Sequence, residues 1–288
     1  MTTEVVLDTS VLLDLLSDAS LRSAFVAKAA KGDALVVVPL AVLDEAFVNN
    51  KDRSAKAAAL AELADRVRMR SMDGVASLVC LEHVLGGLAK TAVHAEECTI
   101  NLVSELASMR QRQRVEQAVQ HVSKWKRRAK VDDNQFRNRR RQAEPVRQLL
   151  EIVNSLTPLS LPSWVVEASL SRCFEHLAEP SRPAAREVLP LPLARRRALL
   201  AWSGFAFIAF VANLTTEPEL TPFPSLAFLR RDRNDFYDAN IAACAAYADL
   251  LLTKDANLLA RAEFLRARAI VSFGAQDLVG FVANASST

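Results

Sequence analysis

Two short apolar runs near the N-terminus predict buried β-strands. Residues 5–7 are Val-Val-Leu and lead into Asp8, and residues 34–38 are Ala-Leu-Val-Val-Val and lead into Pro39. Apolar runs of this length without alternating polar residues are typical of parallel strands that helices cover on both faces. Leucine-rich and alanine-rich segments with helical spacing follow both runs. Residues 1–70 therefore predict the βααβαα order of an α/β domain.

The last part of the chain returns to this alternation. Small and apolar residues after Asp235 predict a helix, and the run Leu-Leu-Leu-Thr253 predicts a strand with Asp255 just beyond its end. The carboxyl ends of parallel strands meet at one edge of a sheet, so we expect Asp8 and Asp255 to lie at the same edge. Further elements are predicted as a helix over 256–268, a strand over 269–273 and a helix over 275–282.

Between these two parts the pattern is almost entirely helical. We therefore predict a split α/β domain, a small parallel β-sheet flanked by helices, formed by residues 1–73 and 230–288, with a large all-α insertion over residues 74–229. Within the insertion, residues 198–211 are strongly apolar. This segment is shorter than the roughly 20 residues that a membrane-spanning helix needs. It predicts a core helix or a partner-binding helix, and we expect no membrane association.

The composition is typical of a cytoplasmic globular protein. The chain has 288 residues, of which 51% are hydrophobic, enough for a sizeable core. Its four cysteines form no Cys-x-x-Cys pair and lie in apolar segments, which indicates reduced core residues rather than disulfides. The N-terminal sequence Met-Thr-Thr-Glu lacks the basic region of a signal peptide.

Positive charge is concentrated in one part of the predicted insertion. Residues 110–147 hold thirteen basic and four acidic side chains, a net charge of +9, which leaves −6 for the rest of the chain. Lys and Arg bind phosphate groups, and the interspersed Trp125 and Phe136 can stack on bases. The segment predicts contact with RNA or DNA, although an acidic protein partner such as an inhibitor also fits the charge. The candidate nucleic-acid-binding residues are Lys124, Lys126, Arg127, Arg128, Lys130, Arg137, Arg139, Arg140 and Arg141.

Four acidic residues stand at the ends of predicted elements, namely Asp8, Glu45, Asp238 and Asp255. Each has a simple structural explanation as a helix cap, a first-turn acid or an exposed helix residue. Carboxylates gathered in one cleft, however, repel each other unless a cation joins them. Oxygen ligands of this kind favour Mg²⁺ or Mn²⁺. Such an ion can activate water and stabilise the charge that develops on a phosphodiester under attack.

The segments that carry these acids resemble the motifs of the PIN-domain nucleases. Val-Val-Leu-Asp8-Thr-Ser-Val-Leu-Leu resembles the opening of that family, and Val-Val-Val-Pro-Leu-Ala-Val-Leu-Asp-Glu45 is similar to its second strand and the following helix. Asp238-Ala-Asn-Ile-Ala-Ala-Cys-Ala and Leu-Leu-Leu-Thr253-Lys-Asp255 are similar to the segments that carry the third and fourth acids. The resemblance covers residues 1–70 and 230–285 and leaves out the large helical insertion.

The resemblance implies a metal-dependent endoribonuclease that hydrolyses RNA phosphodiester bonds. It implies that Asp8, Glu45, Asp238 and Asp255 are the catalytic residues and the ligands of Mg²⁺ or Mn²⁺. It also implies, more weakly, the toxin of a toxin–antitoxin or defence system, with an antitoxin or inhibitor protein as a partner; a homodimer stays open. The alternative is a catalytically silent PIN-like protein that binds nucleic acid or acts as an adaptor.

Several assignments within the site stay open at the level of sequence. Asp44 can take the place of Glu45, and Asp235 can assist or replace Asp238. Ser10 and Thr253 are expected to hydrogen-bond the carboxylates as auxiliary residues, or they are ordinary turn residues. A phosphatase of the haloacid-dehalogenase type needs a second acid where Ser10 stands. A Rossmann enzyme needs a glycine-rich turn after the first strand, and the sequence has none there.

Overall fold

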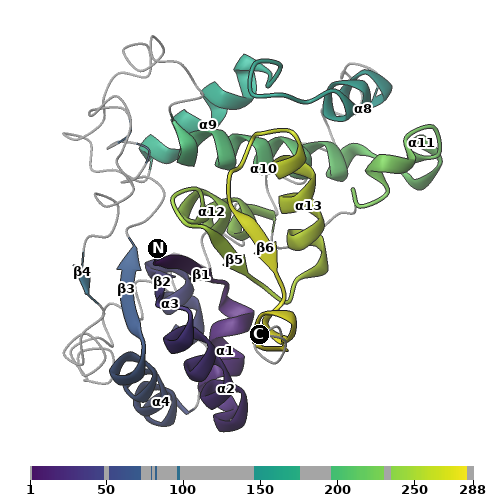
Figure 1. Ribbon diagram of the computed structural model, residues 1–288. Helices are drawn as coiled ribbons and strands as arrows, with labels where there is room; N and C mark the ends of the chain where they lie inside the picture. The colour runs from purple at the N-terminus through teal and green to yellow at the C-terminus, as the bar shows by residue number, and fades with distance from the viewer. Residues whose placement is uncertain are drawn as a thin grey trace.

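A mostly parallel sheet forms the centre of the computed structural model (Figure 1). Within the described residues the sheet has the order β4-β3-β2-β1-β5-β6, and all neighbouring strands are parallel except β3 and β4. The strands are β1 (Thr3–Leu7), β2 (Ala34–Pro39), β3 (Arg68–Met72), β4 (Glu96–Glu97), β5 (Leu250–Leu252) and β6 (Gly274–Gln276). The structure describes residues 2–48, 52–72, 79, 82, 96–97, 146–175, 196–229 and 235–283.

Helices flank this sheet. Those of the N-terminal part lie together at the lower end of Figure 1, and α10, α12 and α13 lie above them. The N-terminal helices are α1 (Thr9–Ser17), α2 (Ala19–Lys31), α3 (Leu40–Val48) and α4 (Arg53–Arg66). The later ones are α8 (Val146–Asn154), α9 (Ser163–Glu175), α10 (Arg197–Leu214), α11 (Glu217–Leu220), the 3₁₀ turn η6 (Pro224–Leu226), α12 (Asp235–Ala245), α13 (Ala256–Ala267) and α14 (Leu278–Ala283).

The strand order reverses direction between β1 and β5. From β1 the sheet continues through β2 to β3 on one side, whereas β5 and β6 lie on the other side. Ligand sites of open α/β sheets form beyond the carboxyl ends of the strands at such a switch point. Asp8 directly follows β1 and Thr253 directly follows β5. The predicted α/β class, with parallel strands flanked by helices, is therefore confirmed, and the switch point coincides with the first acid.

Two strands lie where the sequence pattern predicted none. Strand β3 escaped prediction because Arg68, Arg70 and Ser71 interrupt its apolar residues, although it pairs in parallel with β2 along its whole length. Strand β4 lies inside the stretch that was expected to be entirely helical. It pairs antiparallel with β3 and extends the sheet at that edge, so the all-α prediction for residues 74–229 is wrong at this point.

The strand predicted over residues 269–273 is a loop, and β6 begins directly after it at Gly274. Ala269 has a φ of 58°, in the left-handed region, and the N–H groups of Ala269 and Ile270 donate to carbonyl groups in the last turn of α13. Left-handed endings of this kind satisfy the free carbonyl groups at the end of a helix. The apolar residues of this segment therefore terminate α13, and α14 begins at Leu278 instead of the predicted Ala275.

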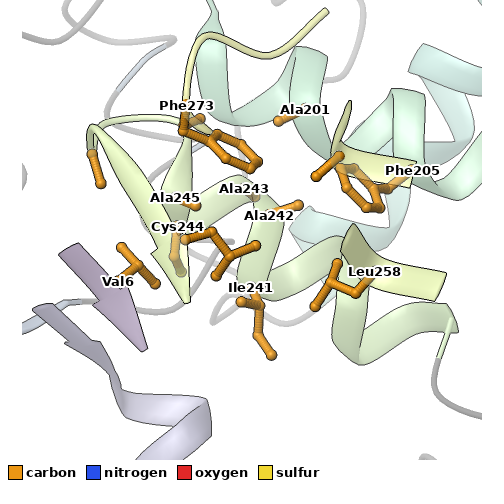
Figure 2. Packing of buried hydrophobic residues seen from close by; sticks show 14 of the residues in the cluster. Val6, Ala201, Phe205, Ile241, Ala242, Ala243, Cys244, Ala245, Leu258 and Phe273 are labelled. Carbon is orange, nitrogen blue, oxygen red and sulfur yellow. The ribbon is translucent and has the colours of Figure 1, made fainter. Parts of the chain in front are cut away.

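Helix α12 forms the centre of the core above the sheet. Its alanines and Cys244 are buried, and Figure 2 shows its residues 241–245 lying between Val6 of β1 and Phe205 of α10. Small side chains allow the helix to approach both neighbours closely, and aromatic and aliphatic side chains from those neighbours fill the remaining space. Helix α10, from the predicted insertion, thus belongs to the same hydrophobic core as β1 and α12.

Helix α10 is apolar around its circumference, which is typical of a helix surrounded by protein or lipid. It spans 18 residues, more than the 198–211 that the sequence pattern indicated. Among the described residues it is the one helix that could cross a membrane by length and composition, but 78% of it is buried within the structure. The prediction of a core helix is confirmed.

A buried glutamate caps this helix. The carboxylate of Glu82 accepts hydrogen bonds from the N–H groups of Ala198 (2.7 Å) and Leu199 (3.1 Å), and the hydroxyl of Tyr247 donates to it. Two of the N–H groups that a helix leaves without partners are thereby satisfied. Burial raises the pKa of Glu82, while its hydrogen bonds and the positive charge of Arg196 act in the opposite direction.

Gly204→Ala should destabilise the protein. An added methyl group would lie 2.6 Å from Cγ2 of Ile270, and that side chain is itself buried and β-branched, so it has little room to move aside. Overpacking costs about 1–3 kcal/mol, whereas alanine in a helix gains about 1 kcal/mol over glycine; we expect a net loss in urea denaturation. The control is Gly32→Ala, where the methyl group has ordinary contacts. An unchanged midpoint for Gly204→Ala would contradict the close packing of α10.

Glu82→Gln should change how stability depends on pH. Because burial raises the folded-state pKa of Glu82 above its ordinary value of 4.5, its contribution to stability is fully present below pH 4.5 and is lost as the pH rises through the raised pKa. The wild type should therefore lose stability relative to Glu82→Gln over this range, as measured by urea denaturation at several pH values. The exposed Glu151→Gln should keep the wild-type dependence. Parallel curves for wild type and Glu82→Gln would contradict the prediction.

Candidate functional site

Asp8 lies at the carboxyl end of β1, where it is also the N-cap of α1. The residue is only 8% exposed. The Oδ1 atom accepts a hydrogen bond from the N–H of Thr9 (2.6 Å), and Oδ2 accepts from the hydroxyls of Ser10 (2.7 Å) and Thr253 (2.8 Å). Within the described part of the chain, no basic side chain pairs with this carboxylate.

The hydroxyl of Thr253 links the first and fourth predicted acids. It donates to Asp8 and accepts a hydrogen bond from the N–H of Asp255 at 3.0 Å, and the residue is fully buried. A hydroxyl has one donor and two acceptor positions, so these two bonds are compatible. The side chain of Asp255 itself caps α13, accepting from the N–H groups of Asn257 (2.7 Å) and Leu258 (3.1 Å). Asp255 therefore caps α13 with its side chain while its backbone N–H donates to Thr253.

Glu45 reaches the same edge of the sheet from α3. Its Oε2 accepts a hydrogen bond from the hydroxyl of Thr9 at 2.7 Å, so one residue separates it from Asp8 along the hydrogen-bond chain. Burial, and then the negative charge of Glu45, raise the pKa of Tyr237 to about 12. Tyr237 stands in the first turn of α12, which also carries Asp238.

Asp238 differs from the other three acids because it forms an ion pair with a buried arginine. It is 5% exposed, and its Oδ2 lies 3.5 Å from Nη1 of Arg261, whose side chain is fully buried on α13. Sequence reasoning did not single out Arg261. The signal was present, because Arg261 stands between Leu258 and Leu265 at helical spacing, where a core-facing helix normally carries an apolar residue.

A salt bridge lies at the border of this region. The ammonium group of Lys254 lies 2.5 Å from the carboxylate of Asp14 on α1, and the backbone N–H of Lys254 is 3.4 Å from the Ser10 hydroxyl that bonds Asp8. Both partners are substantially exposed, so the pair contributes little to stability. It does fix the loop after β5 against α1, beside the buried carboxylate.

The structure therefore brings together most, but not all, of the predicted residues. Asp8, Glu45, Ser10, Thr253 and the backbone of Asp255 form one connected chain of hydrogen bonds in which Thr9 is the link to Glu45. Asp238 instead forms an ion pair with Arg261. No group of three or more His, Cys, Asp or Glu residues able to hold a metal occurs in the described part. The side chains of Asp44 and Asp235 and the basic residues between Arg110 and Arg141 lie outside the described residues, whereas Arg147 stands on α8 and pairs with Glu151.

Asp8 and Glu45 fit a divalent cation by the chemistry of their donors. Carboxylate oxygens are ligands that Mg²⁺ and Mn²⁺ prefer. Asp8 is a buried carboxylate that has hydrogen-bond donors but no positive partner among the described residues, and a buried charge of this kind is costly unless a counter-charge compensates it. The same reasoning does not apply to Asp238, because Arg261 already supplies its counter-charge.

Comparisons with protein-family models, with curated proteins and with solved structures find no match to this chain.

Thr253→Val should destabilise the protein. The isosteric valine leaves Oδ2 of Asp8 without one donor and the N–H of Asp255 without its acceptor. Unsatisfied buried polar groups cost about 1–3 kcal/mol each, so we expect a loss in that range in denaturation without divalent ions. Thr253→Ser keeps the hydroxyl and should retain most of the stability. Equal losses for the two variants would show that the methyl group matters and not the hydrogen bonds.

Proposed function

We propose that the protein is a metal-dependent endoribonuclease that hydrolyses RNA phosphodiester bonds. The observation that carries the proposal is the buried carboxylate of Asp8 at the switch point of the sheet. It has no basic partner in the described region and is joined through Thr9 to the carboxylate of Glu45. Two carboxylates at this place, one of them without a counter-charge, favour a bound cation over a purely structural role.

In this proposal Mg²⁺ or Mn²⁺ is held by Asp8 and Glu45, with Asp238 and Asp255 at the same edge of the sheet. Such an ion supplies positive charge that stabilises the phosphate under attack and lowers the pKa of water. Ser10 and Thr253 keep the Asp8 carboxylate in one orientation by donating to Oδ2, since outer hydrogen bonds orient ligands. Asp255, tied through Thr253, fixes the loop that follows β5.

The wider proposal is a PIN-like nuclease domain. It is supported by the order of the four acids along the chain and by the position of two of them beyond neighbouring parallel strands. RNA as substrate, a cytoplasmic location and a role as the toxin of a toxin–antitoxin or defence system rest on the resemblance of the motifs. The net charge of +9 over residues 110–147 supports binding of the substrate backbone.

The second candidate is a PIN-like protein that binds nucleic acid without cleaving it. The observation that favours it is the ion pair between Asp238 and Arg261, which occupies a carboxylate that the resemblance assigns to the metal. In that case the basic residues would bind RNA and the remaining acids would be structural. The two candidates differ in one measurable property, which is cleavage.

Asp8→Asn should abolish RNA cleavage. The wild type should cut single-stranded RNA with Mn²⁺ present, stop in EDTA, and leave 5′-phosphate and 3′-hydroxyl ends, because water attacks rather than the 2′-hydroxyl. The asparagine variant removes the charge that holds the cation, and we expect its rate to fall about a hundredfold or more. Gel analysis of end-labelled RNA measures both.

The matched control is Asp33→Asn. It makes the same chemical change at an exposed residue that bonds Thr2 and has a φ of 46°, a conformation that asparagine tolerates. This variant should cleave at the wild-type rate. Cleavage that persists in EDTA and in Asp8→Asn would contradict the proposed function. RNA binding by wild type and Asp8→Asn alike, without any cleavage, would identify the protein as the silent binding protein.

A further inference from the structure

Helix α13 carries two charged groups that bear on the site. Its N-cap is Asp255, and two turns further on it carries Arg261. A fully buried arginine is rare unless it is paired. The helix thus begins at the proposed site with the carboxylate of Asp255, and it carries the guanidinium of Arg261 in the protein interior.

The acid that Arg261 contacts is Asp238 and not Asp8. Nη1 of Arg261 lies 3.5 Å from Oδ2 of Asp238. Arginine stays protonated in proteins, so Asp238 has a permanent positive charge beside it. A carboxylate that already has a buried counter-charge gains less from a metal ion than one that has none.

The pair lies toward the edge of the sheet that carries the proposed metal site. Asp238 stands in the first turn of α12, and this helix leads into β5 and packs against β1 and β5. A helix that leads into a parallel strand runs back along the sheet, so its first turn lies toward the carboxyl ends of the strands. Asp8 and Glu45 are linked through Thr9. Asp238 therefore lies toward the same edge of the sheet as Asp8 and Glu45, but it alone has a guanidinium group as its counter-charge.

We propose that Arg261 is a positioning residue that serves as a resident cation of the site, so that a single divalent ion is held by Asp8 and Glu45 while Asp238 stays paired with Arg261. This inference rests on the proposed function, because it divides the roles within the same site. It separates Asp238 from the metal ligands that the resemblance to PIN-domain nucleases implies. A purely structural salt bridge between α12 and α13 is the competing explanation.

Calorimetric titration of the full-length protein with Mn²⁺ tests whether Asp8 and Glu45 bind the ion while Asp238 stays paired with Arg261. The wild type should bind one Mn²⁺, and Asp8→Asn should weaken binding at least about tenfold. The double variant Asp238→Asn with Arg261→Met removes both charges, and should bind one Mn²⁺ within about threefold of the wild-type affinity because the charge near the ion is unchanged in sum. Buried pairs replaced as a unit are tolerated, so this variant should fold.

Arg261→Met alone should leave the carboxylate of Asp238 without its counter-charge. It should bind Mn²⁺ at least about tenfold more tightly than wild type, or bind a second ion, because a cation near the dication has been removed. Arg261→Lys keeps the charge and should restore the wild-type affinity. A structural salt bridge predicts a loss of stability for Arg261→Met with unchanged Mn²⁺ affinity, and that result would overturn the inference. If Arg261→Met fails to fold, Arg261→Gln removes the same charge while it keeps a hydrogen-bond donor for Asp238, and the same tighter binding of Mn²⁺ is expected of it.

The two proposals fail in different ways. A double variant that loses Mn²⁺ as Asp8→Asn does would show that Asp238 is a direct ligand, and would overturn this inference while leaving the nuclease proposal in place. A wild type that binds no Mn²⁺ would overturn both. A wild type that binds Mn²⁺ through Asp8 but cuts no RNA would overturn the nuclease proposal alone.

Discussion

Pairing between β1 and β5 is the interaction on which the candidate site depends. These strands come from opposite ends of the chain, yet they lie side by side, with Val6 opposite Leu251. The N–H of Asp8 donates to the carbonyl of Leu252 at 3.0 Å, which extends the ladder one step beyond β1. The hydroxyl of Thr253 then reaches the carboxylate across 245 positions of sequence. A shift of one residue in this pairing would turn these side chains to the other face of the sheet.

The pairing holds because α12 and α10 cover it. Small buried residues of α12 lie against β1, and α10 closes the other side of α12 (Figure 2). The candidate acids thus stand at the rim of a tightly packed core, and the rim is where buried carboxylates can still meet solvent or ligand. Capping and function do not exclude each other there, because Oδ1 of Asp8 serves the start of α1 while Oδ2 receives two hydroxyls.

The sequence predicted the strands that consist of continuous apolar runs and the acids that directly follow them. Strands β1, β2 and β5 and the places of Asp8 and Asp255 followed from such runs, because parallel strands buried on both faces have little polar alternation. Strand β3 carries arginines, and its strand character comes from pairing with β2 rather than from its own composition. The apolar residues after α13 could equally have formed a strand; only the left-handed turn at Ala269 decides against it.

Arg261 shows why the chemistry of the site was harder to predict than its location. Periodicity places a residue on a buried face, but it does not say which acid a buried base meets, because that depends on how α12 and α13 lie against each other. The fold offers two solutions to the cost of buried carboxylates. Asp238 receives a guanidinium from inside the protein, whereas Asp8 receives hydroxyl and N–H groups alone from the described residues. A carboxylate compensated from within needs nothing from solution, so the uncompensated one is where a cation from solution gains most.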